Sequence, residues 1–102
     1  MALDFAILDS EGAPARYIPI GISLHQRLIE LAAHLDSGLV TRMHDYYQDV
    51  DYLRSEISPL LEELETIHKS ADDNDLVDLL VQLEQLCHEA LDRGLVVSII
   101  AD

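Results

Sequence analysis

The sequence predicts an α+β fold, in which a small antiparallel sheet of three strands packs against about four helices. Two observations predict it: strand-like stretches lie at both ends of the chain, and apolar residues recur at helical spacing between them. Apolar residues make up 49% of the 102 residues, which is enough for one hydrophobic core and leaves no room for a second. We therefore expect residues 1–102 to form a single domain, with the helices on one face of the sheet.

The strands are expected as an N-terminal hairpin and a C-terminal strand. Residues 2–8 alternate larger apolar side chains with smaller or polar ones, which is typical of a half-buried strand. A turn-forming cluster follows, and strand character returns at 15–20, where Pro19 cannot donate a ladder hydrogen bond and so favours a sheet edge. Residues 95–100 are short and β-branched, which predicts a third strand beside the hairpin.

The first two helices are expected in the first half of the chain. Ser23 and Gln26 have the spacing of a capping box, and the apolar stripe that follows predicts a helix over 24–35. A shorter second helix is expected over 39–47, where apolar and aromatic residues continue at helical spacing. Residues 49–57 have neither helical nor strand period and are expected to form a loop or a single turn.

The last two helices have clearer signals at their ends. Ser58 followed by Pro59 is a typical start, with proline at the first helical position, and the third helix should continue to about Lys69. The longest helix is expected over 75–93, because its leucine stripe is the most regular in the chain and Gly94 supplies a typical C-terminal stop.

The charge balance limits the possible partners. The net charge is −14, from 20 acidic and 6 basic residues, and such a field repels nucleic acids and anionic membranes while attracting basic proteins. Four of the six basic residues are arginines outside the strongly acidic stretch 45–92, so we expect the negative field to be concentrated on the second half of the helical layer. Glu62, Glu63 and Glu65 are expected to form a solvated helix face there.

The sequence favours a cytoplasmic protein. A single cysteine, Cys87, excludes an internal disulfide and is common in a reducing compartment. The N-terminal residues lack the basic and long apolar regions of a signal peptide. No apolar run approaches the ~20 residues that a membrane-spanning helix needs.

Catalytic and metal-binding patterns find little support. Ser23 follows Gly21 in a stretch that resembles a nucleophile elbow, but the final glycine of that motif is missing, and a helix cap is the better interpretation. Cys87 and His88 are adjacent on an expected helix and so point about 100° apart. The five histidines have no zinc-ligand spacing. We therefore expect no enzyme activity, no cofactor and no metal site.

The segment HDYYQDVDYLRSE, residues 44–56, is the best candidate for a binding surface. It holds three of the four tyrosines and four carboxylates, and tyrosine is enriched at the energetic centres of interfaces. Tyr52 lies outside any period and is expected to project from the chain, whereas Tyr47 could belong either to the core or to the interface. The predicted partner-binding residues are Asp45, Tyr46, Asp49, Asp51 and Tyr52, with Glu56 at the rim.

In these features the chain resembles the small acidic immunity proteins of bacterial toxin–immunity systems. The resemblance lies in the size, the acidity and the grouping of Asp45, Tyr46 and Tyr47 with Asp49 and Asp51. It implies a protein that binds a cognate basic toxin, often a nuclease, and occludes it. The expected hairpin and C-terminal strand depart from the all-helical immunity fold, so no interface is carried over residue by residue.

Two other classes of function are kept open. A nucleic-acid mimic that regulates a DNA-binding protein would place carboxylates at phosphate-like spacing along one face. An adaptor domain would instead assemble through its edge strands, and 95–100 is the candidate edge. We expect a monomer or a weak homodimer, whereas a stable homodimer with no basic partner would favour the adaptor.

Overall fold

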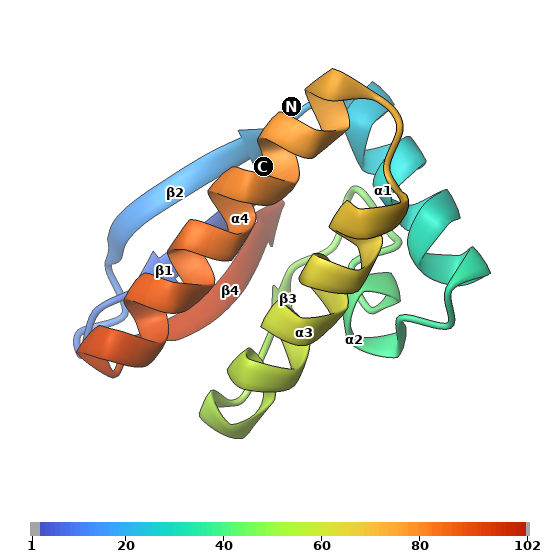
Figure 1. Ribbon diagram of the computed structural model, residues 1–102. Helices are drawn as coiled ribbons and strands as arrows, with labels where there is room; N and C mark the ends of the chain where they lie inside the picture. The colour runs from blue at the N-terminus through green and yellow to red at the C-terminus, as the bar shows by residue number, and fades with distance from the viewer. Residues whose placement is uncertain (1–2, 102) are drawn as a thin grey trace.

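The computed structural model describes residues 3–101, so residue 2, where the first strand was predicted to begin, lies outside the described residues. The elements follow in the order β1 (Leu3–Leu8), β2 (Pro14–Ile20), α1 (Ile22–His34), α2 (Gly38–Thr41), β3 (Val50–Asp51), α3 (Arg54–Ser70), α4 (Asn74–Arg93) and β4 (Val96–Ala101). The helices gather on one side of an antiparallel sheet (Figure 1). The predicted α+β class is therefore confirmed.

The sheet has four strands in the described residues, in the order β2-β1-β4-β3, rather than the three that the sequence predicts. The additional strand is β3, whose two residues are too few to show a period of two. β2 lies at an edge, as Pro19 indicates. β4 lies between β1 and β3, so the expectation that residues 95–100 form an open edge for assembly is wrong.

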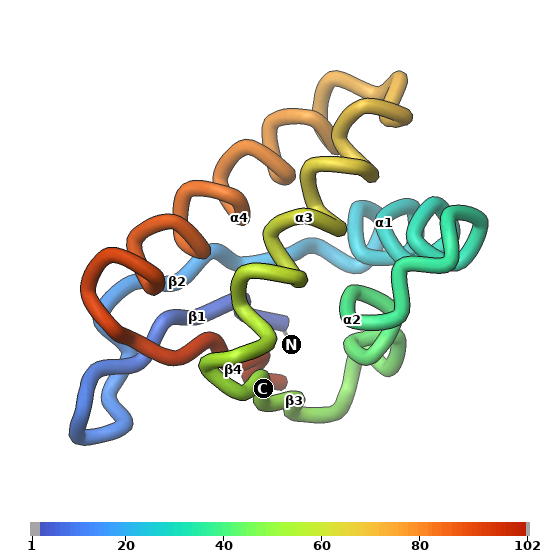
Figure 2. Tube along the Cα trace, turned by 60° about the horizontal axis from the view of Figure 1, so that its bottom comes forward, coloured from blue at the N-terminus to red at the C-terminus, as the bar shows by residue number. Residues whose placement is uncertain are grey.

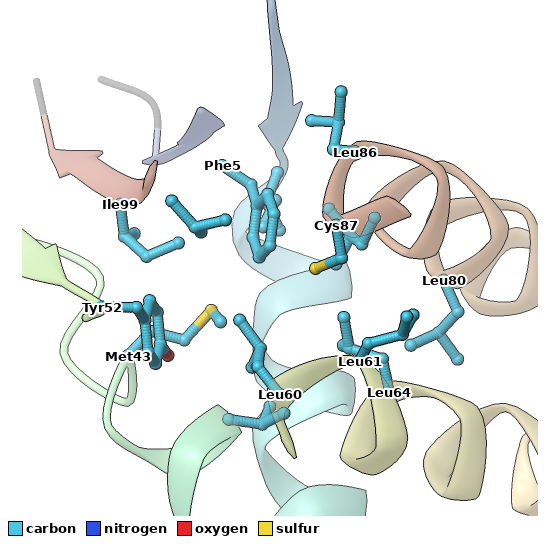
Figure 3. Packing of buried hydrophobic residues seen from close by; sticks show 14 of the residues in the cluster. Phe5, Met43, Tyr52, Leu60, Leu61, Leu64, Leu80, Leu86, Cys87 and Ile99 are labelled. Carbon is cyan, nitrogen blue, oxygen red and sulfur yellow. The ribbon is translucent and has the colours of Figure 1, made fainter. Parts of the chain in front are cut away.

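The core lies between the sheet and the helices. Phe5 of β1 pairs in register with Ile99 of β4, and both side chains are fully buried under the helical layer (Figure 3). Leu64 of α3 and Leu80 of α4 belong to the same buried cluster, and these two helices pack against each other. Figure 2 shows the two helices side by side above the sheet. Burial of this continuous apolar cluster provides most of the stability of the fold.

The predicted start of the first helix is corrected by the structure. The residue before α1 is Gly21, and Ser23 lies inside the helix without capping it, so the predicted capping box does not form. Gln26 instead donates a hydrogen bond to Glu30 on the next turn.

The second helix is much shorter than predicted, because α2 ends at Thr41 and the chain then forms turns. α3 begins at Arg54, so Pro59 lies inside the helix and does not start it. The reason is Glu56, which accepts the N–H of Leu53, the residue before the helix, and so fixes an earlier start.

The long helix α4 agrees with its predicted boundaries. Asp73 caps its N-terminus by accepting the N–H of Asp75. Gly94 ends it in the left-handed conformation, with φ of 67°, which glycine adopts without strain. In residues 3–101, none of the helices has both the length and the apolar composition required to cross a membrane.

Candidate functional site

The segment 44–56 crosses from the end of α2 through β3 to the first turn of α3, along one edge of the sheet (Figure 2). Every side chain that the sequence places in a binding surface makes a hydrogen bond within the protein itself. These residues are Asp45, Tyr46, Asp49, Asp51, Tyr52 and Glu56. The segment has little secondary structure, so these side-chain hydrogen bonds hold it in place. The crowding of tyrosines and carboxylates therefore has a structural explanation.

Tyr52 is buried, and the expectation that it projects from the chain is wrong. Only 3% of its surface is exposed, and its ring lies beside Met43 in the core (Figure 3). Its hydroxyl donates to the carbonyl of Leu39 over 2.6 Å, and burial raises the pKa of the phenol. The cause is the short strand: Val50, Asp51 and Tyr52 alternate inward, outward and inward.

Asp49 and Asp51 are exposed residues that tie the segment to β4. A carboxylate oxygen of Asp49 accepts the N–H of Ala101 over 2.7 Å, where β3 no longer provides a partner. Asp51 accepts the hydroxyl of Ser98 over 2.6 Å on the outer face of the sheet. Each carboxylate retains acceptor capacity toward solvent, because a single hydrogen bond uses only part of it.

Glu56 is the acceptor of a bidentate ion pair. Arg42 donates to its two oxygens over 2.9 and 2.6 Å, and the N–H of Leu53 donates to it as well. These bonds favour the charged form, with that from Arg42 the largest effect, and lower the pKa of Glu56 to about 2. The guanidinium of Arg42 also lies 5.2 Å from the centre of the Tyr52 ring. Glu56 therefore links helix α3 to the loop and to the core.

Glu63 is a structural residue that the sequence interpretation missed. Its two carboxylate oxygens accept the N–H groups of Leu39 and Val40, over 3.2 and 2.9 Å. These are unsatisfied donors in the first turn of α2, so a side chain from α3 caps a helix elsewhere in the chain. The expectation of a solvated face at Glu63 is therefore wrong. No local sequence signal could have found this pair, because its members lie more than 20 residues apart.

Tyr47 is the exposed tyrosine of the segment, with 60% of its surface in solvent. Its ring makes an edge contact with Tyr46, at 5.6 Å between ring centres, and Tyr46 in turn contacts the buried His25 at 5.0 Å. The hydroxyl of Tyr46 donates to the carbonyl of Ile20, and Asp45 accepts the N–H of Tyr47. Tyr47 is therefore outside the core, yet its backbone and one side of its ring are held.

Folding brings together basic and acidic residues that lie far apart in the sequence. The four arginines outside the acidic stretch all pair with acids inside it: Arg16 and Arg93 with Glu89, Arg27 with Asp73, and Arg42 with Glu56. The expected concentration of negative charge is thus partly neutralised. Several exposed carboxylates have no ion-pair partner among residues 3–101. They include Asp49 and Asp51 beside β4, Glu62 and Glu65 on α3, and Asp75 and Asp78 on α4.

The described residues contain possible metal ligands and one free thiol, that of Cys87. Within them, no group of three or more histidine, cysteine or acidic side chains is placed to hold a metal ion. Cys87 is fully buried, and burial raises the pKa of its thiol to about 12, so the reactive thiolate is disfavoured. A scan of protein-family models and searches of curated proteins and solved structures found no match to this chain.

Proposed function

We propose that this protein binds a basic protein partner, a toxin of nuclease type, and neutralises it by occlusion, as the small acidic immunity proteins do. The net charge of −14 supports a basic partner, because a field of this sign accelerates the approach of positive surfaces and repels nucleic acid. The protein contributes shape and charge, and no residue of its own takes part in catalysis.

The observation that carries this proposal is the exposed ring of Tyr47. An aromatic side chain that is held in place before binding loses little conformational entropy in an interface. The edge contact with Tyr46 and the turn fixed by Asp45 restrain Tyr47 in this way while leaving most of it in solvent. Tyr47 therefore replaces the buried Tyr52 as the proposed aromatic anchor, and Tyr46 supports it from behind.

The carboxylates near Tyr47 supply the electrostatic part of the proposed surface. Asp49 and Asp51 follow it within the same segment, are exposed and have no ion-pair partner among residues 3–101. Their hydrogen bonds to β4 hold them in fixed positions, so they can steer a partner and set its register without first becoming ordered. Glu56 is already saturated by Arg42 and stays at the rim of the surface.

Co-expression with the product of the neighbouring gene tests the proposal. If that gene encodes a toxin, cells that produce it should grow only when this protein is present, and the two proteins should co-purify. The variant Tyr47→Ala should protect less well at equal expression. The variant Val81→Ala is a matched control, because it truncates an exposed apolar side chain on α4. Absence of both protection and co-purification with the wild-type protein would contradict the proposal.

A further inference from the structure

A groove of about 260 Å³ lies between the edge strand β2 and the beginning of α4, on a surface distinct from the segment 44–56. Its apolar wall is formed by Ile18 of β2, Leu24 of α1 and Leu79 of α4. Two exposed carboxylates, Asp75 and Asp78, line the same groove from the first turns of α4. The groove therefore combines an apolar surface with negative charge, beside an open sheet edge.

The backbone of β2 presents unpaired polar groups next to this groove. The N–H of Ala101 in β4 points away from β1, because it donates to Asp49. In antiparallel strands, successive residues direct their backbone N–H and C=O groups to opposite sides. When this alternation is followed from Ala101 through the registers of β4, β1 and β2, the backbone groups of Tyr17 and Pro19 point toward the free edge of β2. An extended peptide could accept the N–H of Tyr17 and donate to the carbonyl groups of both residues. Such an edge is the usual template for strand addition.

The other end of the same interface shows how β2 and α4 accommodate a cation. There Arg16 of β2 reaches across to Glu89 of α4, which Arg93 also contacts. Asp75 and Asp78 lie on the same helix, earlier in the chain, and neither has an ion-pair partner among residues 3–101. Adjacent carboxylates on one helix repel each other, so a cation supplied from outside would be stabilised between them.

We propose that this groove binds an extended segment of a partner protein, which adds a strand to β2 and places a lysine or arginine side chain between Asp75 and Asp78. A second copy of this chain does not suit the site, because each copy carries a net charge of −14 and would bring like charges together. Pro14 is the first residue of β2 and Pro19 its last but one, and neither has an N–H group, so they restrict strand pairing to a short stretch and disfavour open-ended assembly. This inference does not depend on the proposed toxin partner, because it concerns another surface.

The test is a nuclear magnetic resonance titration of the ¹⁵N-labelled protein with the capped peptide Thr-Val-Lys-Val-Thr. We expect saturable shifts at the amides of Tyr17, Ile18, Asp75 and Asp78. A peptide with norleucine in place of lysine should bind about three- to tenfold more weakly, because it retains the strand and loses the charge pair. The double variant Asp75→Asn/Asp78→Asn should reduce the affinity for the lysine peptide by a similar factor.

The double variant Glu62→Gln/Glu65→Gln is the matched control, since it removes two exposed acids at the same helical spacing from α3. It should bind the lysine peptide like the wild-type protein. Equal weakening by both double variants would show a nonspecific charge effect and overturn the proposal. Shifts that lie outside β2 and the start of α4, or complete displacement of the peptide by equimolar spermidine, would overturn it as well.

Discussion

Replacing Tyr52 by phenylalanine removes a single oxygen atom from the core and tests whether this residue stabilises the fold. The ring is 3% exposed, and the phenylalanine ring fills the same space. The change eliminates the 2.6 Å hydrogen bond to the carbonyl of Leu39, at the start of α2. The carbonyl, in a partly buried position, then loses one of its two hydrogen bonds and keeps the N–H of Arg42 at 3.3 Å.

The expected cost is that of one lost hydrogen bond, because the carbonyl of Leu39 stays paired with the N–H of Arg42. An intramolecular hydrogen bond contributes about 0.5–1.5 kcal/mol net, so the loss of this partly buried bond should cost about 1 kcal/mol. For a domain of this size, that corresponds to a decrease in Tm on the order of 5 °C. The arginine–ring contact of Arg42 is retained, because phenylalanine also presents an aromatic face.

Urea unfolding followed by circular dichroism measures this difference, with Tyr47→Phe as the matched control. Tyr47 is 60% exposed, so removal of its hydroxyl should change the free energy of unfolding by less than about 0.5 kcal/mol. The urea dependence should be the same for both variants, since neither changes the surface exposed on unfolding. If the two variants unfold at the same urea concentration, the assignment of Tyr52 as a structural residue is refuted.

Three further predictions concern titratable side chains. Arg42 lowers the pKa of Glu56 from 4.5 to about 2, so the stability that this pair provides should be present above pH 4.5 and lost as the pH falls toward 2. In a plot of urea midpoint against pH, Glu56→Gln should flatten this part of the curve. An unchanged curve would contradict the pairing. Glu63→Ala should speed hydrogen exchange at the amide of Val40, while unchanged exchange there would exclude the capping role. Cys87 should react with a thiol reagent at pH 8 only after unfolding in urea, and rapid reaction of the folded protein would contradict its burial.

The sequence predicts best those helices and strands that are long enough for their pattern of apolar residues to recur several times. The helix α4 has 20 residues, an N-terminal cap at Asp73 and a glycine stop at Gly94, and its boundaries were predicted closely. The strand β3 has two residues, and α2 has four, so neither is long enough to establish a period. The early start of α3 depends on Glu56, which caps the helix from its third position.

The candidate site was harder to predict, because its contacts join distant parts of the chain. Asp49 bonds to a residue 52 positions away, and Asp51 to one 47 positions away. An acidic residue with such a partner looks the same in sequence as a solvated one. Tyr52 is different, because the alternation with Val50 was visible, but three residues are too few to distinguish a strand from a loop.

The binding surface around Tyr47 is tested most directly by titration calorimetry of the wild-type protein and Tyr47→Ala with the toxin encoded by the neighbouring gene. An anchor at the centre of an interface contributes about 2 kcal/mol or more, so Tyr47→Ala should bind at least roughly 30-fold more weakly. Its urea midpoint should stay close to that of the wild-type protein, because the ring is mainly in solvent. Equal affinities of the two folded proteins for the partner would contradict the proposed surface.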